Sequence, residues 1–354
     1  MIRLFSGNTV NTTRVWGDHN LDVMINSLQM AFPGFPRTMV SWKPNALVLA
    51  PITAFPFAFT ASSLVHYPNN APVMLVPERL TEEVSQEILR LDPEGKDVPA
   101  QVLLIGPVSE NVERQVRELG LSTLRIGSQN PYETAVAVSD FRFAYPPMSE
   151  LGRRNLFLLS GESFIEGMVT PNFAMHVGMP VLLTKRMELP PVVMRFLMGH
   201  QRMNVYLVGS ETTISREVEA AVRQTIKGDV VRITGNSPHE ISVNFSRFFD
   251  PRTGVGWNRN QPGRGDAFSF VPADDWRLAI FSGVFSHLGK HAPLLVTELD
   301  QLPSAVLRYL QYLNPPRRIT TQPPYMHAYV FGNFDSIFYQ EQVNIEEAIN
   351  IKGH

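Results

Sequence analysis

Short, fully apolar runs recur along the chain with a period of about 110 residues. Some of these runs open with a proline and others end in a glycine, and both sets keep the same spacing: Pro72–Val76, Pro180–Thr184 and Pro293–Thr297, and then Val102–Gly106, Val205–Gly209 and Ala328–Gly332. Strands that are apolar throughout are typical of parallel sheets covered by helices on both faces. The pattern therefore predicts three copies of one α/β module.

Segments with helical periodicity lie between these strands. After each strand that opens with a proline, one stripe of side chains recurs at positions i, i+4 and i+7: Val84, Ile88 and Leu91, then Val193, Leu197 and His200, then Val306, Leu310 and Leu313. Ser109 and Ser215 lie shortly after strands that end in glycine, and as N-cap residues they predict a further helix. The alternation favours three small modules, each a mainly parallel sheet flanked by helices.

Each copy also contains an earlier helix and a buried strand. We predict the helices at 21–31, 132–141 and 239–249, and the strands at Ala46–Ala50, Leu156–Leu159 and Leu278–Phe281. In the third copy the segment 250–275, which carries several glycines and prolines, lies between the predicted helix at 239–249 and the predicted strand at Leu278–Phe281. We expect this segment to be a long loop that belongs to the third module alone.

Every copy is introduced by an arginine, a β-branched residue, a polar loop with a glycine, and an acid eight positions after the arginine. The pairs are Arg14 and Asp22, Arg125 and Glu133, and Arg232 and Glu240. We interpret them as a structural repeat motif in which each arginine pairs with an acid or a helix end where modules meet. Binding of an anion by these arginines is the alternative.

The repeat sets the expected module boundaries at 1–124, 125–231 and 232–354. Because no fourth copy follows the third, the N-terminal segment up to Val15 is expected to close against the third module. Three like surfaces that close in this way give a pseudo-threefold arrangement.

Composition excludes several classes of protein. No apolar run approaches the ~20 residues of a membrane span, so no membrane span is expected. The net charge of -2 gives no basic field for nucleic acid. The absence of cysteine removes disulfides and thiolate chemistry. The N-terminus lacks a basic segment followed by an apolar stretch, so no secretory signal is expected, and both a surface and an intracellular location stay open.

Catalytic and metal-binding motifs are also missing from the sequence. His287 and His291 stand at i and i+4 but do not form the His-Glu-x-x-His pattern of a zinc site. Neither a phosphate-binding glycine loop nor a nucleophile elbow is present. We therefore expect no catalytic residue, no cofactor and no metal.

Four local motifs resemble the cell-wall-binding repeat 2 family. They are Arg125-Ile126 with Tyr132–Ala135, Phe164–Met168, Pro180–Thr184, and Val108-Ser109 before a helix. The resemblance implies a pseudo-threefold set of α/β modules, as found in surface-layer and cell-wall proteins of Gram-positive bacteria. It also implies non-covalent anchoring to an anionic wall polymer without catalysis. The family's Asp-Arg pair before Tyr-Glu-Thr-Ala is replaced here by His19-Asn20, Asn130-Pro131 and Ser237-Pro238.

The resemblance directs attention to the ends of the strands that open with proline, where the polymer would lie. Cations near these ends would serve an anionic ligand, and Arg offers the better fork geometry. The candidate polymer-binding residues are Arg79, Thr184, Lys185 and Arg186. The third copy carries Glu298 instead. The alternative is that these residues are ordinary core and solvated surface.

Three functions fit this pattern. The first is a non-catalytic scaffold of a bacterial cell or spore surface whose partner is an anionic cell-wall glycopolymer. The second is a self-assembling coat, filament or lattice, a homo-oligomer joined through aromatic segments such as Phe141–Tyr145 and Phe268–Phe270. The third is an intracellular nucleotide-binding enzyme with its ligand near Gly106, Ser160-Gly161, Gly209 or Gly332. We favour the first because no catalytic motif accompanies the threefold repeat.

Overall fold

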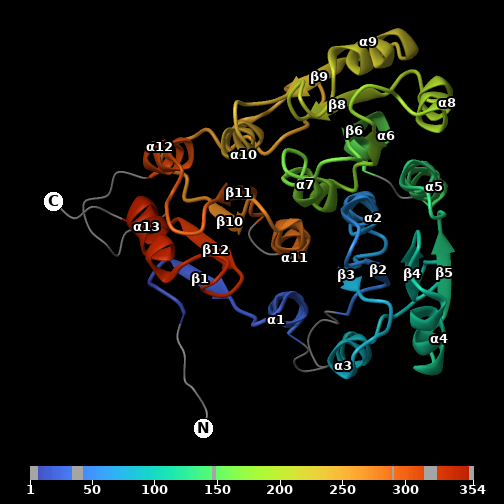
Figure 1. Ribbon diagram of the computed structural model, residues 1–354, viewed down its shortest axis with the longest axis horizontal. Helices are drawn as coiled ribbons and strands as arrows, with labels where there is room; N and C mark the ends of the chain where they lie inside the picture. The colour runs from blue at the N-terminus through green and yellow to red at the C-terminus, as the bar shows by residue number, and fades with distance from the viewer. Residues whose placement is uncertain (1–6, 34–42, 146–148, 289–290, 315–324, 351–354) are drawn as a thin grey trace.

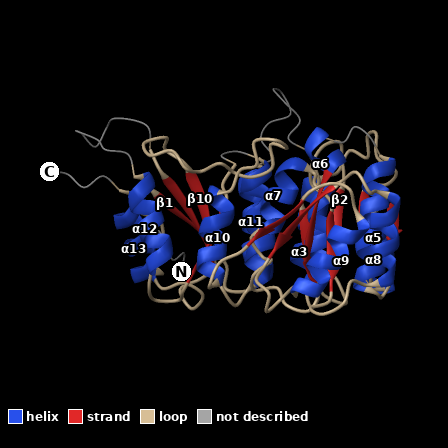
Figure 2. Cartoon of the chain, turned by 90° about the horizontal axis from the view of Figure 1, so that it is seen from above, coloured by secondary structure: helices blue, strands red, loops and turns tan. Residues whose placement is uncertain are grey.

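The strands of this protein form three separate four-stranded sheets, and every strand pairing is parallel. The structure is a computed structural model that describes residues 7–33, 43–145, 149–288, 291–314 and 325–350. Figure 1 shows three modules around a common centre, and Figure 2 shows helices on both sides of the strands. The expected fold class, three small α/β modules in a pseudo-threefold arrangement, is confirmed.

The sheets share one strand order. The first sheet, β3-β2-β4-β5, consists of β2 (Leu47–Pro51), β3 (Val73–Val76), β4 (Val102–Ile105) and β5 (Thr123–Ile126). The second, β7-β6-β8-β9, consists of β6 (Asn155–Ser160), β7 (Val181–Thr184), β8 (Asn204–Val208) and β9 (Val230–Ile233). The third, β11-β10-β12-β1, consists of β10 (Ala267–Pro272), β11 (Leu294–Thr297), β12 (His327–Phe331) and the N-terminal β1 (Thr12–Val15).

The strand β1 confirms that the N-terminal segment closes against the third module. It pairs with β12 so that Arg14 lies opposite Val330. The strands β5 and β9 hold the corresponding edge in the first and second sheets. The proposed boundaries at 124/125 and 231/232 fall inside β5 and β9, so each sheet is completed by the strand that begins the next sequence repeat.

Helices fill the segments between the strands. They are α1 (Asn20–Ala31), α2 (Phe55–Ala61), the 3-10 turn η1 (Ser62–Leu64), α3 (Glu82–Leu91), α4 (Glu110–Glu118), α5 (Pro131–Ala144), α6 (Glu150–Arg154), α7 (Thr170–Val177), α8 (Pro191–Gly199), α9 (Arg216–Thr225), α10 (Pro238–Arg247), α11 (Trp276–His287), α12 (Ser304–Leu313) and α13 (Tyr339–Ile349). Ser109 and Ser215 cap α4 and α9 as expected, each accepting a bond from the amide three residues on.

The third module corrects two expectations. Leu278–Phe281 is not a strand but part of α11, and the strand is β10, which lies inside the segment 250–275 that was expected to be a loop. Helix α11 is buried on nearly every side, so its sequence lacks a polar face. A short apolar run without polar positions shows neither the helical nor the strand periodicity of hydrophobic residues, so the sequence pattern could not distinguish a helix from a strand here. Phe268 and Phe270 are accordingly fully buried rather than available as a contact surface.

The inner helices α2, α7 and α11, one from each module, meet at the centre (Figure 1). Helix α7 packs along α11, and the buried Asn172 Nδ2 donates to Ser282 Oγ at 2.9 Å and to Ser286 Oγ at 3.1 Å. The ring of Phe55 in α2 makes edge contacts with those of Phe164 and Trp276. The modules are therefore held together by a packed interior as well as by the chain.

The close approach of α7 and α11 predicts a specific sensitivity at Gly283. A Cβ atom there would overlap Sδ of the buried Met175, so Gly283→Ala should destabilise the fold by about 1–3 kcal/mol, as overpacking usually does. Chemical denaturation monitored by circular dichroism measures this change. Gly199→Ala at the end of α8 is the matched control, since a Cβ there meets no atom within 4 Å. Equal stabilities of the two variants would contradict the packing described.

Candidate functional site

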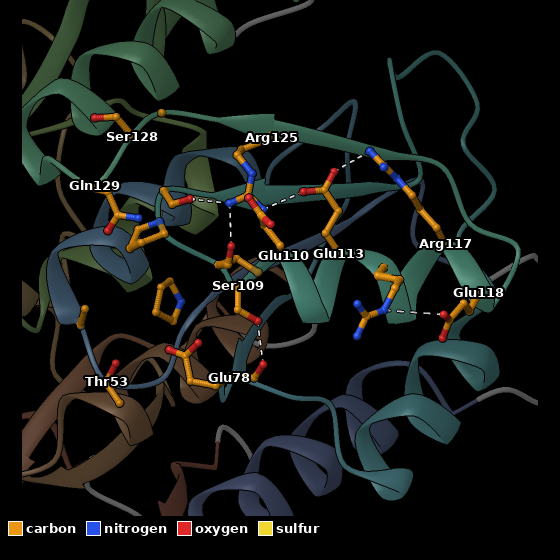
Figure 3. Close-up of a pocket in the computed structure, with 17 residues that line it drawn as sticks. Thr53, Glu78, Ser109, Glu110, Glu113, Arg117, Glu118, Arg125, Ser128 and Gln129 are labelled. Atoms are coloured by element: carbon orange, nitrogen blue, oxygen red, sulfur yellow. Dashed lines mark hydrogen bonds and ion pairs between the residues drawn. The ribbon is translucent and has the colours of Figure 1, made fainter.

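A groove of about 1050 Å³ lies at the carboxyl ends of β2, β4 and β5 in the first module (Figure 3). Its walls come from the loops that follow these three strands and from α4. Parallel sheets place ligands at this edge because the loops there are free to vary. Its volume exceeds the volume of about 370 Å³ of the groove at the corresponding edge of the third module. The residues that line it are therefore candidates for contact with a ligand.

The turn between β4 and α4 forms the floor of this groove. Gly106 has a positive φ of 59°, and a Cβ at this position would overlap the ring of Phe57. Ser109 Oγ accepts the amide of Val112 at 3.1 Å and donates to the carbonyl of Glu78 at 2.6 Å. The turn is thus tied both to its own helix and to the loop after β3.

Arg125 holds this turn from the neighbouring strand. Its Nη1 donates to the carbonyls of Gly106 at 2.8 Å and Val108 at 2.6 Å, and its Nη2 donates to Glu113 Oε2 at 2.7 Å. Arg117 binds the other oxygen of Glu113 at 2.5 Å. The hydrogen bond from Arg125 lowers the pKa of Glu113, which is therefore ionised at neutral pH.

The same arginine clamp occurs in all three modules. Nη1 of Arg232 binds the carbonyl of Gly209 at 3.0 Å, and its Nε binds Glu219 at 2.8 Å. Nη1 of Arg14 binds the carbonyl of Gly332 at 3.1 Å, and its Nε binds Gln342 at 2.7 Å. Each arginine therefore fixes the glycine turn at the end of the adjacent strand, within one sheet.

The arginine clamp of the third module differs from the other two because the side-chain amide of Gln342 takes the place of the glutamate carboxylate. Burial lowers the pKa of Arg14 to about 10, and Nη2 of this side chain is buried without a hydrogen-bond partner. The guanidinium instead lies 4.6 Å from the ring centroid of Phe334, a cation–π contact. Gln342 uses its own amide to donate to Thr12 at 2.7 Å, which fastens the N-terminal strand.

The acids of the sequence motif do not contact these arginines. Asp22 accepts the amide of His19 at 2.9 Å, Glu133 accepts the hydroxyl of Ser128 at 2.9 Å, and Glu240 accepts the amide of Asn236 at 2.9 Å. All three brace the loop in front of α1, α5 or α10. Arginine and acid of one motif thus stabilise two different turns.

The sequence did not identify the true partners of the arginines. These are Glu113, Glu219 and Gln342, which stand at the same place in α4, α9 and α13. A usable signal was present, since both glutamates follow the capping serines of their helices by four residues.

Three of the four candidate polymer-binding residues lie at the corresponding edge of the second module, but one of them faces inward. Thr184 is fully buried, and its hydroxyl donates to the carbonyls of Lys185 at 3.0 Å and Glu188 at 3.1 Å. Nζ of Lys185 lies 3.1 Å from the carboxylate of Glu188. The side chain of Arg186 is exposed, and so is that of Arg79 in the first module.

Glu78, Arg186 and Leu299 occupy equivalent positions on the rims of the three modules. The backbone carbonyl of each accepts a hydrogen bond from the N-cap residue of α4, α9 or α13. The carbonyl of Glu78 accepts from Ser109, that of Arg186 accepts from the amide of Ser215 at 2.9 Å, and that of Leu299 accepts from the amide of Phe338 at 2.8 Å. This rim position therefore carries an acidic residue in the first module, a basic residue in the second and an apolar residue in the third. Of the three, the second module presents a cation there.

The grooves of the first and third modules are lined by acidic as well as basic side chains. In the first module the lining arginines are matched by carboxylates: Arg117 and Arg125 bind Glu113, and Arg114 lies 3.8 Å from Glu118. A smaller groove of about 370 Å³ occupies the corresponding edge of the third module. Its charged lining is Asp274, Asp275, Glu298, Asp335 and Arg277. Neither groove carries an excess of positive charge.

The described part of the chain contains no group of three or more His, Asp or Glu side chains arranged to hold a metal ion. His287 faces Asn70, with 3.3 Å between Nε2 and the amide oxygen, whereas His291 faces His176. Over the same residues, no helix is both long enough and apolar enough to cross a membrane.

The fold and the grooves define a class of protein: a triplet of α/β modules whose groove-lining loops differ from module to module. Residues 125–219 match the family of cell wall binding domain 2. The resemblance noted in the sequence is therefore confirmed, and the matched residues make up most of the second module.

Three curated relatives are similar to this chain at low identity. The amidase enhancer of Bacillus subtilis is 26% identical over 213 residues, which is 58% of this chain and 26% of the enhancer. An uncharacterized protein of Pyrococcus horikoshii, PH0614, is 28% identical over 165 residues, 44% of this chain and 46% of that protein. The N-acetylmuramoyl-L-alanine amidase LytC of Bacillus subtilis is 22% identical over 213 residues, 59% of this chain and 39% of LytC. The chain spans less than half the length of each.

Solved structures show the same fold over nearly the whole chain. Cwp6 from Clostridium difficile aligns with a TM-score of 0.76 at 15% identity, covering 96% of this chain and 48% of the other. Cwp8 from the same organism aligns with a TM-score of 0.72 at 17% identity, covering 97% and 52%. The likeness thus extends to all three modules, beyond the one that matches the family.

The clamp predicts a pH-dependent stability difference for Arg125→Met. Loss of the three bonds should destabilise the protein by about 1–3 kcal/mol at pH 7. Because the pKa of Glu113 is lowered in the fold, its contribution is present above the unfolded value and is lost as the pH falls through the folded one. The deficit measured by denaturant titration should therefore shrink towards pH 3.

The matched control for this prediction is Arg216→Met on α9. The side chain of Arg216 is 78% exposed and pairs with the exposed Glu211, so its loss should be close to neutral at both pH values. A deficit for Arg125→Met that stays constant from pH 7 to pH 3 would mean that the ion pair contributes nothing to stability.

Proposed function

We propose that this chain is a non-catalytic scaffold that attaches to the bacterial cell wall through its modules. The main support is the match of the second module to cell wall binding domain 2, within a fold that resembles Cwp6 over 96% of the chain. The names of two relatives, an amidase enhancer and an amidase, associate similar segments with enzymes that act on wall material. Since the chain covers only part of those relatives, our proposal extends to attachment to the wall and not to their activities.

The ligand that we propose is an anionic cell-wall glycopolymer, held mainly at the second module. Arg186 presents an exposed guanidinium on the rim, and Lys185 lies beside it. A guanidinium binds phosphate or carboxylate in a bidentate manner, which suits a repeating anionic polymer. The equivalent positions in the other modules are Glu78 and Leu299, so they offer no such contact, although Arg79 adds one exposed cation to the first module.

The second module also has the polar framework to keep this rim in place. The amide of Arg186 donates to Glu162 Oε2 at 2.8 Å. Glu166 accepts from the amide of Ser210 at 2.7 Å and from its hydroxyl at 2.8 Å. Because both carboxylates are bound to backbone or hydroxyl donors, part of their negative charge is already stabilised within the protein.

Binding to purified cell walls tests the proposal directly. Walls from a Gram-positive bacterium are used intact and after removal of their anionic polymer, and the bound protein is measured after sedimentation. We expect binding to intact walls that falls on stripping and that weakens as salt is raised. Equal binding to both preparations, or binding to neither, would contradict the polymer as ligand.

The rim cations give the sharper prediction. Lys185→Ala combined with Arg186→Ala should weaken wall binding several-fold at low salt and leave the melting temperature nearly unchanged, since exposed charges contribute little to stability. Arg195→Ala with Arg202→Ala removes the same charge from exposed positions elsewhere in this module and should bind almost normally. If both double variants bind equally weakly, net charge rather than the rim controls attachment.

Self-assembly into a coat or lattice is the second function that we consider. Tyr145 is 36% exposed and packs on Phe141, so this aromatic segment reaches the surface, unlike Phe268 and Phe270. Light scattering across a range of concentrations decides the matter. A monomer at all concentrations would remove assembly and leave wall attachment as the role of the isolated chain.

A further inference from the structure

Four histidines gather where the inner helices of the three modules meet. His66 follows η1 in the first module, His176 lies in the last turn of α7 in the second, and His287 ends α11 in the third. His291 follows α11 after a short connection. The sequence separates these residues widely, and only the packing of three modules brings them together.

The rings form two contacting pairs. Those of His66 and His287 lie 5.3 Å apart between centroids, and those of His176 and His291 lie 4.6 Å apart. Nδ1 of His176 and Nδ1 of His291 approach to 3.1 Å, a distance at which the protonated nitrogen of one ring donates a hydrogen bond to the unprotonated nitrogen of the other. Two protonated imidazoles could not share this bond, because each nitrogen would then be a donor.

The other face of His176 is covered by an indole. The ring of Trp257 stacks on it with 5.1 Å between centroids and an interplanar angle of 13°. His287 Nε2 lies 3.3 Å from the amide oxygen of Asn70. Neutral groups therefore pack against these sides of His176 and His287, which are half-buried, whereas His291 is exposed.

The ionic groups around the cluster are cationic. Arg142 Nη2 donates to the carbonyl of Tyr67, the residue next to His66, and Arg259 Nη2 donates to the carbonyl of His291. Arg142 has no carboxylate partner within the described residues and is almost fully buried. Arg259 is balanced by Asp266 at 3.4 Å, but that carboxylate faces the arginine.

These surroundings disfavour protonation. Burial, followed by repulsion from the other histidines, lowers the pKa of His176 to about 3 and that of His287 to about 4. Burial lowers the pKa of His66 as well, with Arg142 adding to the effect. Among the described residues, no carboxylate raises the pKa of any of these three imidazoles.

We propose that this histidine cluster is an acid-sensitive latch between the modules, neutral and closed at neutral pH and opened by protonation as the pH falls below about 6.5. Protonation introduces like charges across the contacts of α7 with η1 and α11. The modules then separate at the centre before the individual sheets unfold. The latch does not depend on the identity of the wall ligand.

The sign of the effect follows from linkage. A histidine whose pKa is lowered in the closed state binds fewer protons there than in the open state, so closure becomes less favourable as the pH falls from about 6.5 towards the folded values. Above about pH 7 both states are neutral and closure is independent of these groups. Opening is thus expected in mildly acidic solution, above the pH at which the surface ion pairs are lost.

Hydrogen exchange at pH 7 and pH 5 tests the latch in the full chain. After correction for the pH dependence of intrinsic exchange, protection of α7 and of the C-terminal half of α11 should fall about tenfold or more at pH 5. Protection of α9, which lies far from the cluster, should be unchanged (Figure 1). Equal protection of α7 and α11 at both pH values would overturn the proposal.

Two substitutions and one control locate the effect. His176→Phe keeps an aromatic ring on Trp257, and His287→Gln keeps a donor for Asn70, so the double variant should close equally well at both pH values. His200→Gln changes the half-buried C-cap histidine of α8, which stacks on Phe196, and should respond to acid like the wild type. A double variant that still loses protection at pH 5 would exclude the cluster as the sensor.

A measurement on the unmodified chain covers the case in which the variants do not fold. Imidazole resonances of the protein are followed by nuclear magnetic resonance as the pH is lowered. Several should titrate well below pH 6.5 and shift together with the signals of the inner helices. If all nine histidines titrate near pH 6.5, the cluster is not desolvated and the latch does not exist.

Discussion

The pairing of each sheet with a strand from the next sequence repeat is the constraint on which the rest of this structure depends. The strands β5 and β9 complete the first and second sheets, and the N-terminal β1 completes the third by pairing with β12. Since the closing strand of the last module comes from the start of the chain, the three modules form a closed set rather than a string. The helices that follow these strands then cross over: α1, α5 and α10 pack beside β3, β7 and β11 of the next sheet.

The arginine carried by each closing strand makes this joint specific. Arg14, Arg125 and Arg232 bind the carbonyls at the glycine turns of the adjacent strands, so the edge strand also fixes the entrance to the following helix. The binding edge of a module therefore rests on a strand that belongs, by sequence, to its successor. Loops above this clamp are free to differ, and the rim position occupied by Glu78, Arg186 and Leu299 shows that they do.

At the centre of the molecule, unlike in the loops above the clamp, close packing restricts which side chains can be accommodated. The inner helices approach closely enough that Gly283 leaves no space for a side chain beside Met175, and the buried amide of Asn172 must find its hydroxyl partners on α11. Polar side chains in such an interior are tolerated only when they are neutral or paired. The half-buried histidines at this junction meet that condition only while they are unprotonated, which couples the central packing to pH.

The sequence by itself determined the number of modules, their α/β class, the capping serines and the family that the second module resembles, because apolar periodicity and short motifs act locally. It did not determine β10 or α11, since a helix buried on all sides loses its amphipathic period. Nor did it show that Thr184 faces the core, that each arginine binds a glycine carbonyl and not the acid of its motif, or that His66, His176 and His287 meet. Those relations join residues far apart in the chain, and only the closure of three sheets around one centre brings them into contact.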